Sequence, residues 1–337
     1  MKTNMKINFK PNENFSYYLY WIDERMKIFW NRMDNKNLPP YTKNEILAEN
    51  KFTNVYRSLD RVSQHLINQV IYTEDTTSPD DTFMRIILFK HFNKIETWEY
   101  LESELGKIGF NTDLNDIIDL LDERVKRGNS IYNPAFMLTA AFMRKEATMQ
   151  MNGLKKGDSK HFSYLKIFEK ELFERGKMEN IKKSNSLKEL YSNISSVMSM
   201  GPFLSMQYAI DFNYSELFDF DENEFIIAGP GAINGINRTF DFDGKPFYEE
   251  VIHWVKDNFE DLCKDYGYEP NLLPGRKPAL IDLQNCFCET DKMLRVMGKS
   301  GSKEVSGTRM KSKFKAEKSF EKPKINYKLP PKWNVKF

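Results

Sequence analysis

Cysteine and histidine are scarce in this chain of 337 residues, which has three of the first and four of the second. Cys286 and Cys288 are only two positions apart, too close for a CxxC redox or zinc motif. We therefore expect neither a disulfide framework nor a zinc or iron–sulfur site. Glycine-rich motifs of the GxGxxG and GxxxxGK[ST] types are also missing, so the chain does not look like a nucleotide-binding kinase.

Long apolar runs are missing as well. No stretch approaches the ~18 residues that a membrane-spanning helix requires. The first eleven residues contain lysines without a following apolar segment, so we expect no secretory signal and a cytoplasmic location. Hydrophobic residues nevertheless make up 40% of the chain, which is enough for a sizeable core and argues against global disorder.

Apolar residues recur at helical spacing through most of the chain and predict an all-α protein. We expect one helical body over residues 1–297, with a subdivision near 185–200, followed by a tail over residues 298–337. The expected helices cover residues 13–33, a short segment after a Thr42 cap, 54–70, 82–93, 96–107, 113–127, 134–149, 161–180, 185–199, 202–212, 246–266 and 279–297.

Charge is distributed unevenly along the chain. Residues 298–337 hold 12 basic and 3 acidic side chains, whereas the remainder holds 38 basic and 45 acidic ones. A basic tail on an acidic body is typical of proteins that bind nucleic acid or another polyanion. A solvated tail without a ligand is the alternative.

The expected helix over residues 54–70 has two separate faces. Val55, Leu59, Val62 and Leu66 form an apolar stripe at 100° per residue, and polar side chains lie opposite. Two arginines one turn from an aspartate suit a phosphate, although a solvent-exposed, self-paired face is the alternative. The polar face consists of Asn54, Arg57, Asp60, Arg61 and Gln64.

The expected helix over residues 279–297 follows the same design. Asp282, Asn285, Glu289 and Lys292 lie within a narrow arc, away from an apolar stripe. Two carboxylates, an amide and an amine on one face supply the groups that acid–base chemistry requires. A solvated face is again the alternative.

Two glycine-containing turns complete the set of candidate sites. Residues 193–213 read as helix, turn and helix around Gly201, and such a turn exposes backbone N–H groups at the start of the second helix. Gly229 and Gly231 follow a short apolar run and precede Arg238, so the main chain there can approach a ligand closely.

Several motifs, taken in their order along the chain, resemble those of the helical proteins of phage thymine hypermodification. These are the α-glutamyl/putrescinyl-thymine pyrophosphorylases and the helical domain that accompanies 5-hydroxymethyluracil DNA kinases. The resemblance covers about residues 15–335. It rests on residues 52–57 and 59–63, Gly201-Pro202-Phe203-Leu204, Ala228-Gly229-Pro230-Gly231-Ala232, Asp282-Leu283-Gln284-Asn285 with Cys288, Glu289 and Lys292, and the closing Leu329-Pro330-Pro331-Lys332-Trp333.

The resemblance implies an all-α fold related to helix-hairpin-helix DNA glycosylases. Aligning the hairpin glycine of that superfamily with Gly201 places its catalytic aspartate near Pro230, where this chain has no aspartate. The departure favours a glycosylase-like way of holding DNA without base excision. An active glycosylase is the third of three readings of the function.

The first reading is modification of 5-hydroxymethyluracil-derived bases in phage DNA. An amine or amino acid would displace a base-linked pyrophosphate, with the base flipped against residues 229–231. Arg57 and Arg61 would neutralise the leaving group, and Glu289 or Asp282 would accept a proton. Magnesium could assist, although no ligand set is readable. The second reading is a non-catalytic DNA-binding module that partners a 5-hydroxymethyluracil DNA kinase.

Overall fold

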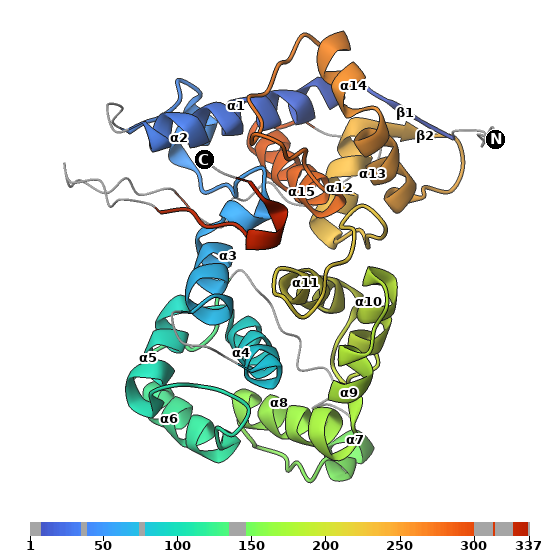
Figure 1. The fold of residues 1–337 in the computed structure, drawn as a ribbon. Helices are drawn as coiled ribbons and strands as arrows, with labels where there is room; N and C mark the ends of the chain where they lie inside the picture. The colour runs from blue at the N-terminus through green and yellow to red at the C-terminus, as the bar shows by residue number, and fades with distance from the viewer. Residues whose placement is uncertain are drawn as a thin grey trace. The chain divides into compact units, whose positions relative to one another are not determined.

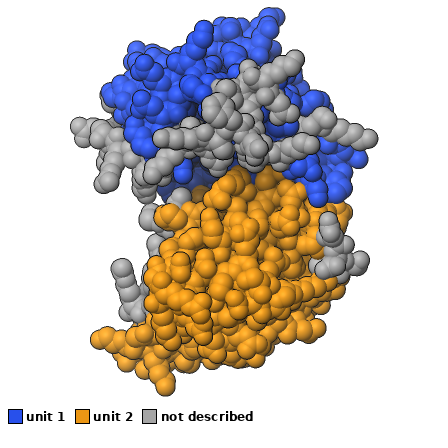
Figure 2. All heavy atoms as spheres, turned by 90° about the vertical axis from the view of Figure 1, so that its left-hand side faces the viewer, with its two compact units in different colours: residues 1–60, 226–337 blue, residues 61–225 orange. Residues whose placement is uncertain are grey.

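The computed structural model describes residues 8–34, 39–73, 78–134, 146–299, 313 and 326–335. The all-α class predicted from the sequence is confirmed, since the described residues form helices in the order shown in Figure 1, with two short strands, β1 and β2, among them. The chain divides into two compact units (Figure 2). Unit 1 comprises residues 1–60 and 226–337, and unit 2 comprises residues 61–225. This division differs from the subdivision near 185–200 that the sequence suggested.

Unit 1 is built around the buried helix α15. Its Phe287 ring stacks on Tyr18 of α1 at 4.1 Å between centroids, and the Tyr18 hydroxyl donates to the Leu283 carbonyl. A short antiparallel pair, with Phe9 opposite Phe242, joins the beginning of the chain to the segment after α12. The elements of unit 1 are β1 (Phe9–Pro11), α1 (Phe15–Met33), α2 (Glu45–Glu49), the 3₁₀ turn η1 (Arg57–Leu59), α12 (Pro230–Thr239), β2 (Phe240–Phe242), α13 (Tyr248–Asp257), α14 (Phe259–Asp265), α15 (Leu280–Val296) and η5 (Pro331–Trp333).

Helices α12 and α15 approach each other closely because glycines line the contact. A Cβ at Gly235 would lie 2.0 Å from the Phe287 carbonyl oxygen, and a Cβ at Gly231 would lie 2.3 Å from Cys288 Sγ. The two glycines are four residues apart and therefore share one face of α12. The space that they leave is thus occupied by α15 rather than by a ligand.

Unit 2 surrounds α4, in which every residue from Phe83 to Phe92 is buried. Ser78 caps this helix in a capping box with Asp81, and the buried Lys90 forms a 3.0 Å ion pair with Asp211 of α11. The elements of unit 2 are α3 (Arg61–His65), the π-helical η2 (Leu66–Ile71), α4 (Pro79–Phe92), α5 (Ile95–Leu105), α6 (Leu114–Lys126), α7 (Glu146–Met151), α8 (Lys160–Phe168), the π-helical η4 (Glu169–Glu174), α9 (Lys177–Lys182), α10 (Leu187–Ser195) and α11 (Pro202–Asn213).

Some predicted helices have different boundaries. The helix predicted over residues 54–70 begins only at Arg61, and Asn44 rather than Thr42 caps α2, because the Asn44 side chain accepts from Leu47 N. The helix predicted over 161–180 is interrupted at Gly176, which has a φ of 68°, and the one over 246–266 at Asn258. The helix predicted over 134–149 falls largely outside the described residues, apart from α7.

Candidate functional site

The candidate site in unit 1 starts from the segment before α3, residues 52–60. Asp60 Oδ1 accepts from Asn54 N at 2.7 Å, and Asn54 Nδ2 donates to the Leu59 carbonyl at 2.7 Å. Side-chain bonds of Asn and Asp to nearby main chain compete with helical hydrogen bonds. They explain why this segment forms a loop with a single 3₁₀ turn instead of the predicted helix.

Asp282 joins this loop to the first turn of α15. Its carboxylate accepts from Ala279 N at 2.9 Å and from Arg57 N at 2.8 Å. The first of these hydrogen bonds caps the N-terminus of α15. Burial raises the pKa of Asp282, and these hydrogen bonds and nearby arginines oppose the rise. The carboxylate therefore holds two segments together that lie 225 positions apart in the sequence.

Glu289 lies further along the same helix and makes a second connection. Its Oε2 accepts from Thr53 N at 3.2 Å, and its Oε1 pairs with the amine of Lys292. The side chain of Glu289 is only 3% exposed. Burial lowers the pKa of Lys292, but the Glu289 carboxylate outweighs this effect and leaves it above the ordinary value.

Asp60 is the most perturbed carboxyl of the cluster. Loss of hydration raises its pKa to about 7, and the Glu289 carboxylate adds to the rise. The hydrogen bond from Asn54 and the cations Arg57 and Arg25 act in the opposite direction. A carboxyl that titrates near neutral pH beside buried charges is a feature found more often at functional sites than elsewhere.

Two residues that the sequence reasoning missed complete the cluster. Arg25 of α1 donates to Thr53 O at 2.9 Å and to Asn54 Oδ1 at 3.2 Å. Tyr327 packs against Phe29 with 5.2 Å between ring centroids, and burial raises its pKa, with Asp60 contributing. Position 25 has the helical spacing of the buried stripe of α1, so an arginine there was a readable signal. Tyr327 left no such signal.

The other predicted residues of unit 1 lie in separate contacts. Asn285 Oδ1 accepts from Gln284 Nε2 at 2.9 Å, and the same glutamine accepts from Gly229 N at 3.1 Å. Arg238 is buried, with Nε 2.8 Å from Asp291 Oδ1 and Nη1 2.6 Å from the Lys299 carbonyl. Gly229 N and the Arg238 guanidinium thus have partners within the fold, and Gly231 packs against Cys288. A phosphate contact by any of the three stays a prediction.

Two predicted residues belong to unit 2. Arg61 is exposed and lies 3.8 Å from Glu96, so it does not share a helix face with Arg57 as predicted, because the helix begins at Arg61 itself. Gly201 lies exposed between α10 and α11, where the structure forms the predicted helix, turn and helix. Contact of this hairpin with DNA stays a prediction. Most of the basic tail over 298–337 falls outside the described residues.

Comparison with known proteins identifies the family. The family model described as "5-hmdU DNA kinase, helical domain" matches residues 12–303. The chain belongs to this family. A 5-hmdU DNA kinase of Bacillus phage SP10 is 21% identical over 285 residues, which cover 81% of this chain and 44% of that protein. The chain thus spans less than half the length of this relative, and no solved structure gives a significant match.

The family match includes both units, and it confirms the resemblance to the thymine-modification helical proteins. Within the described part of this family member, no helix is long and apolar enough to span a membrane. Among the same residues, no three or more His, Cys, Asp or Glu side chains are grouped so that they could hold a metal ion.

Proposed function

We propose that the chain acts in the modification of 5-hydroxymethyluracil-derived bases in DNA, as a helical module that holds the DNA for a 5-hydroxymethyluracil DNA kinase. The observation that carries this proposal is the family match over residues 12–303. We infer that a domain which accompanies a DNA kinase presents or positions the same DNA. The two units would supply the protein surface for that contact.

The geometry of the unit 1 cluster favours this reading over catalysis by the same residues. Asp282 is committed to Arg57 N and Ala279 N, and Glu289 to Thr53 N and Lys292. Buried carboxylates with such partners stabilise a fold, and removing one leaves donors unsatisfied. A general base must instead reach the proton that it removes.

The second candidate is a base-modifying transferase, which replaces a base-linked pyrophosphate by an amine or amino acid. It is favoured by Asp60, whose pKa of about 7 suits a proton acceptor at neutral pH. The incoming ammonium would lose its proton to a carboxylate, its nitrogen would bond to the 5-methylene carbon, and pyrophosphate would leave. Lys292 pairs with Glu289, and Arg57 and Arg25 act electrostatically on Asp60.

One pair of variants separates the two candidates. Asp60→Asn keeps the side-chain shape and an acceptor for Asn54 N and removes the carboxylate. Glu260→Gln is the control, because Glu260 pairs with Lys277 at the surface of unit 1. Each variant is tested for affinity to a fluorescein-labelled duplex containing 5-hydroxymethyluracil. Each is also tested for conversion of pyrophosphorylated DNA to the aminated base, followed by nucleoside mass spectrometry.

For the holding module, we expect both variants to bind the duplex with the affinity of the unmodified chain. We also expect that neither the unmodified chain nor the variants convert pyrophosphorylated DNA. For the transferase, we expect Asp60→Asn to lower turnover by about 100-fold or more while its affinity stays the same. Conversion by the unmodified chain would overturn the first proposal. Absence of DNA binding by the unmodified chain would overturn both.

A further inference from the structure

The turn between α10 and α11 in unit 2 has a main-chain conformation that its sequence does not favour. Ser199 has a φ of 72°, a region that side chains other than glycine rarely adopt. Such a residue keeps its conformation only when surrounding contacts determine it. The turn, residues 196–201, therefore needs support from outside the hairpin.

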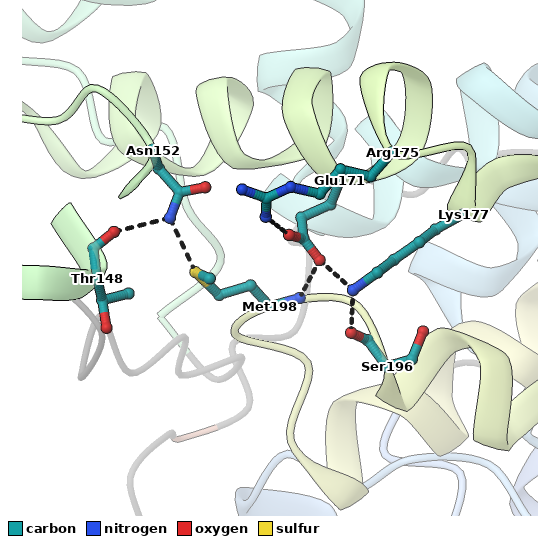
Figure 3. A network of polar contacts seen from close by, with 7 residues as sticks. All are labelled: Thr148, Asn152, Glu171, Arg175, Lys177, Ser196 and Met198. Atoms are coloured by element: carbon teal, nitrogen blue, oxygen red, sulfur yellow. Dashed lines mark hydrogen bonds and ion pairs between the residues drawn. The ribbon is translucent and has the colours of Figure 1, made fainter. Parts of the chain in front are cut away.

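Glu171 supplies this support from η4 (Figure 3). Its carboxylate accepts from Met198 N at 3.2 Å, directly before Ser199, and it pairs with Arg175 and Lys177. Lys177 also donates to the Ser196 carbonyl. The Glu171 side chain is 3% exposed, so one buried carboxylate holds the turn through its main chain and through a lysine.

A second contact holds the Met198 side chain. Asn152 Nδ2 donates to Met198 Sδ at 3.2 Å and to the Thr148 carbonyl at 2.7 Å (Figure 3). Asn152 is itself buried. The residue before the strained Ser199 is thus held at its main-chain nitrogen by one element and at its sulfur by another.

The supported turn has a surface that suits a polyanion. Arg175 and Lys177 keep 37% and 24% of their side chains exposed, although both pair with Glu171, and this group of three has one positive charge in excess. Lys155 and Lys156 are exposed in the loop that directly follows the Asn152 contact. Gly201, Pro202 and Phe203 are exposed at the start of α11. Exposed cations and the exposed start of a helix are groups that contact phosphates in DNA-binding proteins.

We propose that Glu171 is a positioning residue that fixes the turn 196–201 so that this surface of unit 2 meets the phosphates of duplex DNA. The proposal rests on the proposed function, because it assumes that the chain holds DNA. Glu171 does not touch the DNA itself. It acts through Met198, Ser196 and the two cations that it orients.

The test is Glu171→Gln in the full chain, with Glu102→Gln as the matched control. Glu102 is also in unit 2 and pairs with the buried Arg85, away from the hairpin. Fluorescence anisotropy with a labelled duplex measures affinity, and hydrogen exchange measures protection of the amides from Val197 to Met200. We expect Glu171→Gln to bind about tenfold more weakly, which corresponds to about 1.4 kcal/mol, and to lose protection in the turn.

The direction of this effect is diagnostic. Replacing Glu171 by Gln makes the protein more positive, so general attraction to phosphates would strengthen binding rather than weaken it. Glycine adopts a positive φ without strain, so a turn with Ser199→Gly depends less on its support. We therefore expect Glu171→Gln to lower affinity less when it is added to Ser199→Gly than when it is added to the unmodified chain. Glu102→Gln should bind normally.

Each possible outcome decides one question. If the unmodified chain binds the duplex and Glu171→Gln binds it equally well or better, the positioning role is refuted while the proposed function stands. If turn protection is unchanged in Glu171→Gln, the support itself is refuted without reference to DNA. If the unmodified chain does not bind the duplex, the proposed function fails and the DNA role of Glu171 fails with it.

Discussion

The close approach of α12 and α15 allows a sharp prediction for Gly235→Ala. In an exposed helix the change would stabilise the protein by about 1 kcal/mol, because alanine is the better helix former. At Gly235 the new Cβ would lie 2.0 Å from the Phe287 carbonyl oxygen and 2.6 Å from its carbonyl carbon. Both atoms belong to the main chain in the middle of α15, so no side-chain rotation relieves the clash.

The magnitude follows from what must move. An ordinary contact begins at 3.4 Å, so the helices must separate by more than an ångström at this point. Overpacking of this kind costs about 1–3 kcal/mol, and the shift also strains the Arg238–Asp291 pair and the stacking of Phe287 on Tyr18. Because main-chain atoms clash, we take the upper end of this range, about 3 kcal/mol, and subtract the gain in helix propensity of about 1 kcal/mol. We therefore expect a net loss of roughly 2 kcal/mol in the unfolding free energy of unit 1.

Hydrogen exchange with mass spectrometry measures this loss for each unit separately, through peptides of α12 and α15 and, as an internal reference, of α4. Asn234→Ala is the matched control, because it lies on the same helix, is partly exposed and gains helix propensity without a clash. If the amides of α12 are as well protected from exchange in Gly235→Ala as in Asn234→Ala, the close contact of α12 with α15 at Gly235 is refuted.

Two further predictions concern charge. The Asp60 carboxyl has a pKa of about 7 when folded and an ordinary value of 3.8, so the folded state binds more protons between these values and the stability of unit 1 falls as pH rises through this range. Asp60→Asn keeps an acceptor for Asn54 N, and urea unfolding across this range should give a flatter curve for the variant, whereas parallel curves would contradict the shifted pKa. Deleting residues 299–322 should weaken DNA binding and reduce the log–log salt slope by roughly 0.7–0.9 per lost phosphate contact, and an unchanged slope would make the tail a solvated extension.

The sequence predicted the long helices well, because each buries one face and apolar residues therefore recur every three or four positions. Helices α1, α5, α6, α11 and α15 all lie within three residues of their predicted limits. α12 was missed, since Gly229-Pro230-Gly231 is typical of a turn. In the structure Pro230 is the first residue of the helix and Gly231 faces α15. Only the neighbouring helix explains a glycine at that position.

For the candidate site, the sequence reasoning selected residues of which the structure brings some together. Asp60, Asp282 and Glu289 lie in one cluster with Arg57, although Arg57 contributes its main-chain nitrogen there. Arg61, at the beginning of unit 2, is exposed and lies near Glu96. The predicted helix does not begin before Arg61 because the Asn54 and Asp60 side chains form hydrogen bonds with the local main chain. The helical periodicity of residues 54–70 gives no sign of these bonds.

The two-part construction of unit 1 also sets an order of events during synthesis. Tyr18 of α1 has its hydroxyl partner, Leu283, 265 positions later in the chain. Unit 2, Arg61–Phe225, leaves the ribosome between them and has all its own elements before α15 exists. At synthesis rates of about 5–20 residues per second, the apolar face of α1 waits on the order of ten to fifty seconds for its partner. The apolar face of α1 is therefore exposed to aggregation during that time.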